Sequence, residues 1–446
     1  MYRFRHIFFA IVALCMFNAC SNSEYSEELL NKIAGIDSYQ SDYLNPNDEY
    51  YPYAGLPRII IETEYHQTIK DRENEIPARL QVWGKDAPQS EPIDITIRGR
   101  GNSSWNEMPK KSYKIELLKK RSLLGMPKDR DWALISNYAD KTLMKNYLMY
   151  HLSAELGTYY SPRCEFVELY VNREYLGVYL LTETIKISGN RINIPQNDSS
   201  FLVEIDWRHH ADEQIVYSHV IRQDSSFNGE YWDFHFQIHY PRKASKKSLK
   251  TIERHIQFFE KFLATIRDKQ DNSVAQWIDI DEYVKHYWIQ EFSKNPDADF
   301  RTSVYFSWKK NDVIRMGPVW DFDLAFGGYV WAQTNSPLMW HTDSVYWNHF
   351  LLQDAVMAKT IQDYWVKNRE TFSHVTNVID SIQQVLQDAA TNNFNRWDIL
   401  MRTEHWFHRR SYNNYKDATD DLKAWINKRI EWIDSEMAGL SNQSDF

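Results

Sequence analysis

Two carboxylates stand close together in an apolar segment of the second half of the chain. Residues 317–327 read GPVWDFDLAFG, which places Asp321 and Asp323 two positions apart. A buried carboxylate without a partner is costly, and a hard divalent cation holds such groups through oxygen ligands. In extended backbone, residues i and i+2 point to the same side. The spacing predicts that both carboxylates reach one metal ion; the alternative is a helix cap and a salt bridge.

A second polar segment, residues 294–301 (KNPDADFR), lies just upstream, between a predicted helix and a predicted strand. An Asp in this place, Asp297 or Asp299, can accept the proton of an attacking hydroxyl group. Asn295 can help to hold a second metal ion. The alternative is a capping turn, because Asn, Pro and Asp favour turns.

Basic residues gather in the first half of the chain. Residues 98–105 (RGRGNSSW) form a Gly-rich turn that contains Arg100, and residues 109–114 (PKKSYK) lead into a strand with Lys111 and Lys114. A turn of this kind followed by a basic strand can cradle phosphates, although it matches neither common phosphate-loop motif.

Further candidates follow along the chain. A predicted helix carries Lys141 and Lys145, and a strand ending at Glu183 can offer backbone groups to a nucleotide base. His405 and His408 lie three residues apart on a predicted helix and are interpreted as a surface pair rather than a metal site. There is no G-x-S-x-G or H-E-x-x-H motif.

The elements that must position these residues divide the chain into a β-rich first half and a helical second half, an α+β layout. Alternating or β-branched residues predict seven strands before residue 245: Arg58–Glu64, Ala78–Trp83, Ile93–Arg98, Ser112–Leu118, Glu165–Val171, Tyr175–Thr182 and Phe201–Asp206. Apolar residues at intervals of three and four predict helices, and a strand pair is expected between two of them. The helices are predicted at Asp140–Leu156, Ser248–Arg267 and Ile280–Lys294, the strand pair at Ser303–Trp308 and Val313–Met316, and the last hundred residues are mostly helical.

The N-terminus is typical of an export signal. Two Arg residues precede an apolar run over residues 7–17, and Asn18-Ala19-Cys20 follows. The run is too short to cross a bilayer, which takes about 20 apolar residues. A small residue before Cys20 indicates lipidation of that Cys; a plain signal peptide is the alternative. We therefore expect a signal peptide over residues 1–19, a lipidated tether over residues 20–56, and an exported, membrane-anchored protein.

Composition excludes some classes of function. The chain has 446 residues and a net charge of −9, which becomes −11 when the two Arg residues of the signal peptide are removed. An acidic protein is a poor partner for nucleic acid. The 17 Trp and 28 Tyr residues either pack in the core and at its rim or stack on sugars or a base.

Five blocks in order resemble the CotH kinase family, the kinases similar to spore coat protein H. The blocks are RGRGNSSW with PKKSYKIEL, LISNYADKTLMKN, ELYVNREYLGVYLLTE, KNPDADFR and GPVWDFDLAFG, which lie between about Arg58 and Gly327. The resemblance implies an atypical, bilobed protein-kinase-like fold over residues 57–330, with the β-rich lobe ending at about residue 245. Residues 331–446 carry no recognised block and are expected to form a helical extension that packs on this core.

The resemblance also implies chemistry: phosphoryl transfer from ATP, with Mg²⁺ or Mn²⁺, to Ser or Thr of a protein. Asp321 would bind the metal with Asp323 beside it, and Asp297 would be the catalytic Asp, although the D-A-D-F-R spelling leaves Asp299 in competition. Lys114, with Lys111, Arg100 and Lys145, would contact phosphates, and Glu183 would lie near the adenine. The alternatives are a lipid-anchored binding protein, either a pseudokinase scaffold or a glycan-binding surface protein, and transfer of another group from ATP, such as AMP.

Overall fold

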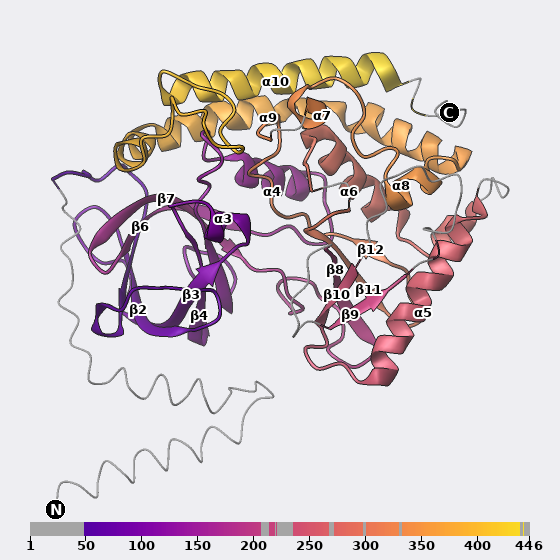
Figure 1. Cartoon of the computed structure of the whole chain (residues 1–446), viewed down its shortest axis with the longest axis horizontal. Coiled ribbons are helices and arrows are strands. Elements are labelled where there is room, and N and C mark those ends of the chain that lie inside the picture. The colour runs from indigo at the N-terminus through magenta and orange to yellow at the C-terminus, as the bar shows by residue number, and fades with distance from the viewer. Residues whose placement is uncertain are drawn as a thin grey trace, which may run out of the picture.

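The computed structural model describes residues 49–206, 214–218, 220, 235–266, 272–297, 300–329, 332–437 and 440. A β-barrel lies on one side, a smaller sheet with its helices lies on the other, and two long helices run across the top of both (Figure 1). The α+β class, with a β-rich first half and a helical second half, is confirmed.

The first lobe is a closed barrel in the order β1-β2-β3-β4-β5-β7-β6. Neighbouring strands are antiparallel except for β1 and β6, which pair in parallel and close the barrel. Apolar residues at alternate positions fill the interior, among them Ile97, Ile115 and Trp132. The strands are β1 (Arg58–Thr63), β2 (Ile76–Trp83), β3 (Ile93–Arg100), β4 (Ser112–Arg121), β5 (Asp129–Ile135), β6 (Cys164–Val171) and β7 (Glu174–Glu183).

Strand alternation also decides what lies outside the barrel. Because successive side chains point to opposite faces, the residues between the inward apolar ones point outward: Arg98 and Arg100 on β3, Lys114 and Glu116 on β4, and Asp131 on β5. Arg100 reaches Trp320 of the second lobe. Of these outward charged side chains, Arg100 is the one that the structure places against the second lobe.

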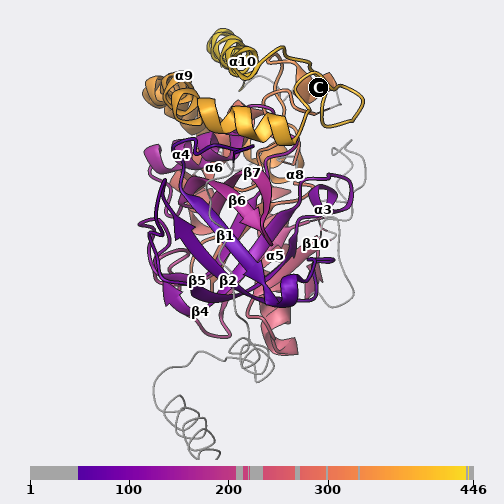
Figure 2. The ribbon, with the colours of Figure 1, turned by 90° about the vertical axis from the view of Figure 1, so that its left-hand side faces the viewer.

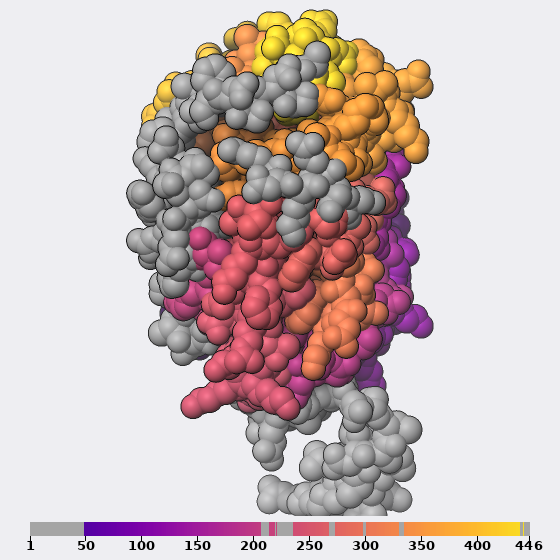
Figure 3. Space-filling model, turned by 90° about the vertical axis from the view of Figure 1, so that its right-hand side faces the viewer, coloured from indigo at the N-terminus to yellow at the C-terminus, as the bar shows by residue number. Residues whose placement is uncertain are grey.

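The second lobe holds a five-stranded sheet in the order β12-β11-β8-β10-β9. Its strands are β8 (Ser200–Ile205), β9 (Ile215–Tyr217), β10 (His235–Tyr240), β11 (Val304–Lys309) and β12 (Arg315–Met316). Helix α5 (Lys246–Leu263) begins at Ser245, whose side chain caps the helix by accepting from the Ser248 N–H. Its apolar face packs inward, and its outer face forms part of the surface in Figure 3.

Helices join the two lobes. Helix α9 (Ala355–Arg396) contacts β7 of the barrel as well as α4 (Lys145–Glu155) and α6 (Ile280–Ser293) of the interior, and α10 (Tyr415–Glu436) packs along α9. Both long helices lie above the barrel in Figure 2. Short helices complete the fold: α3 (Ser103–Asn106), α7 (Ala332–Asn335) and α8 (Tyr346–Leu351), with short 3-10 turns at Glu64–His66 and Asn272–Gln276.

Three expectations need correction. The helix predicted from Asp140 begins at Lys145, because Leu143 has a φ of +62° and residues 140–144 form turns. Strands β5 and β10 were not predicted, since their charged and aromatic residues hide the alternation. Residues 49–56, expected to be tether, pack against the fold: Tyr51 stacks on Tyr175 at 4.2 Å between ring centroids, and Leu56 is buried.

The predicted signal peptide and Cys20 lie outside the described residues. Within the part of the chain that the structure describes, we find no helix with the length and hydropathy needed to span a membrane.

Candidate functional site

The two carboxylates of the W-D-F-D segment meet, although not through the extended backbone assumed from the sequence, because Asp321 has a positive φ. Their side chains share a hydrogen bond, and burial together with the charges of Asp321 and Asp140 raises the pKa of Asp323 to about 8. Asp321 also accepts from the Ser303 hydroxyl at 3.4 Å. Its φ of +67° is in the left-handed region, which costs a non-glycine residue energy and recurs at functional sites. The pair concentrates negative charge at one point.

Helix α4 makes hydrogen bonds to the segment that carries this pair. Asn146 accepts the Phe322 N–H at 2.8 Å, and the buried ammonium of Lys145 donates to the carbonyl oxygens of Ala325 at 2.8 Å and Asp323 at 3.4 Å. Burial lowers the pKa of Lys145. The predicted phosphate ligand Lys145 therefore lies beside Asp323, where its charge opposes that of the carboxylates, and it holds the backbone that carries them.

The Gly-rich segment approaches the same place from the barrel. The Arg100 guanidinium lies over the Trp320 ring, 4.9 Å from its centroid. Burial raises the pKa of Tyr150 and Tyr305 well above the ordinary value, and the Arg100 charge opposes part of that rise. Asp321 acts on the same Tyr150 hydroxyl. Arg100 is thus brought near the carboxylate pair.

Glycine is required in this turn. A Cβ atom at Gly99 would lie 2.5 Å from the Trp105 ring, and Gly101 has a φ of +100°. The segment can therefore fold back on Trp105 only with glycine at these positions.

The two other predicted lysines lie on the same strand but have local partners. Lys111 donates to the carbonyl oxygen of Trp105 and stands over its ring. Lys114 lies on the outer face of β4, 3.5 Å from a carboxylate oxygen of Glu116 and 3.5 Å from one of Asp131. The Lys114 ammonium is therefore paired with two carboxylates of the barrel.

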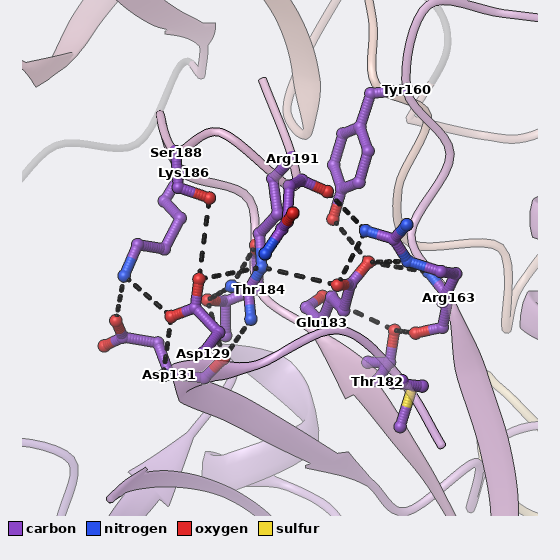
Figure 4. Close-up of polar contacts among 12 residues, drawn as sticks. Asp129, Asp131, Tyr160, Arg163, Thr182, Glu183, Thr184, Lys186, Ser188 and Arg191 are labelled. Atoms are coloured by element: carbon purple, nitrogen blue, oxygen red, sulfur yellow. Dashed lines mark hydrogen bonds and ion pairs between the residues drawn. The ribbon is translucent and has the colours of Figure 1, made fainter. Parts of the chain in front are cut away.

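Glu183 ends β7 in a dense polar network (Figure 4). Its fully buried carboxylate accepts two hydrogen bonds of 2.9 Å from the Arg163 guanidinium, one from the Arg163 N–H and one from the Tyr160 hydroxyl. The side chain is therefore committed to holding the end of β7. The backbone of this segment, which the sequence predicted to serve a nucleotide base, is also engaged, since the Glu183 N–H donates to the Arg163 carbonyl at 3.1 Å.

Arg191 is the centre of that network. It is fully buried and donates to the Thr184 carbonyl, the Thr184 hydroxyl and the Asp131 carbonyl, each at 2.7 Å. Lys186 binds both Asp129 and Asp131. Burial acts to raise the pKa of Asp131, but the Lys186 and Lys114 ammoniums hold that pKa well below its usual range. These contacts fix the segment after β7, between the two lobes, to β5.

The segment with the predicted catalytic Asp follows α6. Lys294 ends the helix in a left-handed conformation, and Asn295 is buried, donating to Gln290 and accepting from the Asp297 N–H at 3.3 Å. The hydrogen bonds of the Asn295 side chain are therefore made within its own segment and to α6. Phe326 donates its N–H to Ser293 at 2.8 Å, which places this segment beside the W-D-F-D segment. Asp299 lies outside the described residues.

Two acidic residues were missed in the sequence. Asp140 lies near Asp323 and accepts the N–H groups of Thr142 and Lys145 at 2.8 Å. Asp206, at the end of β8, accepts from the Thr302 hydroxyl at 2.7 Å, next to Ser303. Asp206 could have been found from the sequence, because Glu204 and Asp206 are acidic residues at alternate positions at the end of an apolar strand.

The interpretation of the two histidines as a surface pair on a helix holds for the exposed His405 but is wrong for the helix and for His408. Residues 402–412 form no helix, and His408 is buried, donating from Nε2 to the Tyr138 carbonyl at 2.9 Å. Within the described ranges, no group of three or more His, Cys, Asp or Glu side chains could hold a metal ion. A cation here would have Asp321 and Asp323 as its protein ligands among those residues.

Comparison with protein families agrees with this geometry. The model of the family described as CotH kinase protein matches residues 97–433, about three quarters of the chain. The match runs from β3 through α9 and most of α10, so it includes the C-terminal helices, in which no block had been recognised. No curated protein matches the chain. The chain belongs to the CotH kinase family.

Proposed function

We propose that this protein transfers a phosphoryl group from ATP to a Ser or Thr hydroxyl of another protein, with a divalent cation held by Asp321 and Asp323. The family supports a kinase. The observation that carries the finer proposal is the shared hydrogen bond of the two carboxyl groups and the raised pKa of Asp323. A carboxyl group that is protonated at neutral pH beside another carboxylate marks a place where a cation is stabilising.

The residues present fit a hard cation such as Mg²⁺ or Mn²⁺. Such ions take carboxylate oxygens and keep several waters, so two carboxylates and a nucleotide phosphate complete their coordination. Bound there, the cation would neutralise phosphate charge. Arg100 comes from the barrel side and Lys145 from the helical side, so phosphates between the lobes would meet positive charge from both.

The acceptor hydroxyl requires a base or a positioning group. Asp297 follows the end of α6, four residues after Ser293, whose carbonyl accepts the Phe326 N–H. In that place it can orient the attacking hydroxyl group, which is the main demand of phosphoryl transfer. The proposal keeps Asp297 as the catalytic Asp and Asp299 as its competitor.

The experiment measures nucleotide binding and transfer together. Purified protein is incubated with labelled ATP and a mixture of proteins, with Mg²⁺, with Mn²⁺ or with a chelator, and nucleotide binding is followed by calorimetry. We expect metal-dependent binding and labelling that Asp321→Ala abolishes. Asp388→Asn, an exposed change on α9, is the matched control.

Two results would reject the proposal. Equal labelling by the wild type and Asp321→Ala would exclude this metal site, provided that circular dichroism shows both chains folded. Nucleotide binding without any transfer would favour a pseudokinase scaffold, and the intact mass of a labelled substrate distinguishes phosphate from AMP.

The glycan-binding alternative receives less support. The aromatic residues of the 329–347 segment that could form a platform include Tyr346 and Trp347, and both are buried in the core. Their aromatic surface therefore stabilises the fold and is not offered to a ligand.

We also propose that the protein is located outside the cytosol and is anchored to a membrane by a lipid on Cys20. Under this proposal the enzyme meets ATP that escapes or is supplied from elsewhere, and its substrate is an exported or surface protein.

A further inference from the structure

Positive charge is concentrated on the outer face of helix α5, although the chain as a whole has a net charge of −9. Residues 242–261 contain seven Lys or Arg residues and two Glu residues. One of the two, Glu260, is fully buried and accepts hydrogen bonds from Tyr346 and Trp347. The surface of this segment is therefore strongly basic.

Six exposed side chains form what we call the α5 strip. They are Lys243, Lys246, Lys247, Lys250, Arg254 and Lys261. From Lys247 onward they recur at intervals of three, four and seven residues, which places them on one face of the helix. Figure 3 shows α5 running across this side of the molecule. None of the six has an ion pair with another described residue.

This arrangement of charge does not stabilise the helix. Like charges three or four residues apart repel one another, as Lys247, Lys250 and Arg254 do. Cations near the start of a helix are also repelled by its dipole, and the first turn of α5, which begins at Lys246, contains no acidic residue. The strip therefore lacks an electrostatic partner within the described structure, and an external anionic surface would supply one.

An exposed aromatic residue lies within the strip. Phe258 is on the same face, between Arg254 and Lys261, and is 55% exposed. The Lys261 ammonium stands over its ring, 5.8 Å from the centroid. A Lys side chain can lay its carbon stem along apolar surface and keep its charge among polar groups. Basic residues around an exposed ring are the combination that amphipathic helices present to a membrane surface.

A neighbouring turn widens the basic surface. The Lys310 N–H donates to the Ser199 carbonyl at 2.8 Å, and the Ser248 hydroxyl donates to the Asp198 carbonyl at 2.9 Å. These two contacts bring the exposed Lys310 close to the start of α5. The helix lies at the outer edge of the second lobe (Figure 1), where a flat partner can reach it.

We propose that the α5 strip binds a bilayer that contains anionic phospholipids, with Phe258 inserted among the headgroups. Four to eight Lys or Arg residues on an amphipathic helix are typical of such binding, and each raises the affinity about fivefold. The strip runs about 22 Å from Lys246 to Lys261. A continuous anionic plane meets all of its charges at once and also covers the aromatic ring, which favours a bilayer over an acidic protein.

This binding depends neither on the kinase proposal nor on a lipid. The described chain begins on the barrel side, where Tyr51 stacks on Tyr175, whereas α5 lies on the other side of the molecule (Figure 1). Residues 21–48 span at most about 100 Å, so a lipid on Cys20 leaves open which face meets the bilayer. The α5 strip would set that orientation.

The test measures binding of the chain expected after export, residues 20–446 with Cys20→Ser, so that no lipid contributes. Co-sedimentation is followed with vesicles of phosphatidylcholine alone and of an equal mixture of phosphatidylcholine and phosphatidylglycerol. We expect binding to the mixed vesicles only, and weaker binding in high salt, because salt screens charges at a surface. No preference for the mixed vesicles overturns the proposal.

A triple variant locates the surface. Lys247→Gln, Lys250→Gln and Arg254→Gln together should weaken binding to the mixed vesicles about a hundredfold, since each of the three charges contributes about fivefold. The melting temperature should not fall, because the changes remove repulsion between exposed side chains. Lost binding then reports the surface and not unfolding.

The matched control removes the same charge from the barrel. Lys119, Lys120 and Arg121 are exposed at the end of β4, and their replacement by Gln should leave binding unchanged. Equal losses in the two triple variants would mean that net charge alone attracts the protein to vesicles, and would overturn the proposal.

Two further measurements separate a bilayer from an acidic protein. Phe258→Ser should weaken vesicle binding about tenfold, because the ring then leaves no apolar surface to bury, and should remove the part that resists salt. Poly-glutamate is the competing probe and should bind at least tenfold more weakly than the mixed vesicles. If poly-glutamate binds and the mixed vesicles do not, the strip docks an acidic protein and the membrane proposal is wrong.

Discussion

The buried ammonium of Lys145 on α4 donates to the carbonyl oxygen of Ala325 across 2.8 Å, which ties the helix to the segment that carries Asp321 and Asp323. The same ammonium offsets part of the negative charge on Asp323. One side chain therefore has a structural and an electrostatic role, and substitutions can separate the two.

Replacing Lys145 by Met should destabilise the W-D-F-D segment, while the Met side chain still fills the volume of the Lys side chain. The carbonyl oxygens of Ala325 and Asp323 lose their donor, which costs about 1–3 kcal/mol in the free energy of unfolding. Loss of the opposing charge should raise the pKa of Asp323 further. Urea unfolding of Lys145→Met and of the exposed control Lys119→Met measures the first effect. Equal stability of the two variants would contradict it.

The metal-free protein should lose stability as pH rises from about 4 to about 8. The pKa of Asp323 is about 8 in the folded chain against an ordinary 3.8. In that window the folded state holds a proton that the unfolded state has lost, so the free energy of unfolding falls with rising pH. Urea unfolding in the presence of a chelator should show this slope, and Asp323→Asn should reduce it. An unchanged slope in that variant would place the proton elsewhere.

Metal binding should release protons below about pH 8. A cation on Asp321 and Asp323 requires both groups ionised, and burial beside the other carboxylate keeps Asp323 protonated in its absence. The affinity for Mg²⁺ or Mn²⁺ should therefore rise with pH up to about 8. Calorimetry in two buffers of different ionisation enthalpy counts the protons released; a count of zero at pH 7 would contradict the shared site.

Arg191→Met should be among the most damaging single changes outside the metal site. It leaves the carbonyl oxygens of Thr184 and Asp131 without this donor and removes one of the two cations beside Asp129, the other being Lys186. Breaking a buried charged network in this way costs about 3–5 kcal/mol. The midpoint of urea unfolding should fall sharply, while the exposed Arg121→Met should change it little.

Cys20→Ser should release the protein from membranes. If Cys20 carries the lipid, labelled fatty acid is incorporated into the wild type and not into the variant, and the variant moves to the soluble fraction. Incorporation into both chains would place the lipid on another residue.

Most barrel strands could be predicted because apolar and polar residues alternate along a half-buried strand, and this alternation is visible in the sequence. Ile97 and Ile115 face the barrel interior while Arg98 and Lys114 face outward. Strand β5 was missed because its sequence, DRDWALI, begins with three charged residues whose partners lie on distant segments. The start of α4 was misplaced because the Asp140 carboxylate stabilises a turn by accepting two backbone N–H groups, and helix periodicity does not register such a turn.

The sequence by itself singled out Asp321 and Asp323, because two carboxylates two residues apart in an apolar segment need partners. It also determined the α+β class and the family, through ordered blocks of residues. Only the tertiary structure decided which charges oppose that pair and which are already engaged. Lys145 comes to the pair from the start of α4 and Arg100 from β3, while the Glu183 carboxylate is engaged by Arg163. The physical reason is that electrostatic partners are set by distance in space, which alternation and helix periodicity along one segment do not contain.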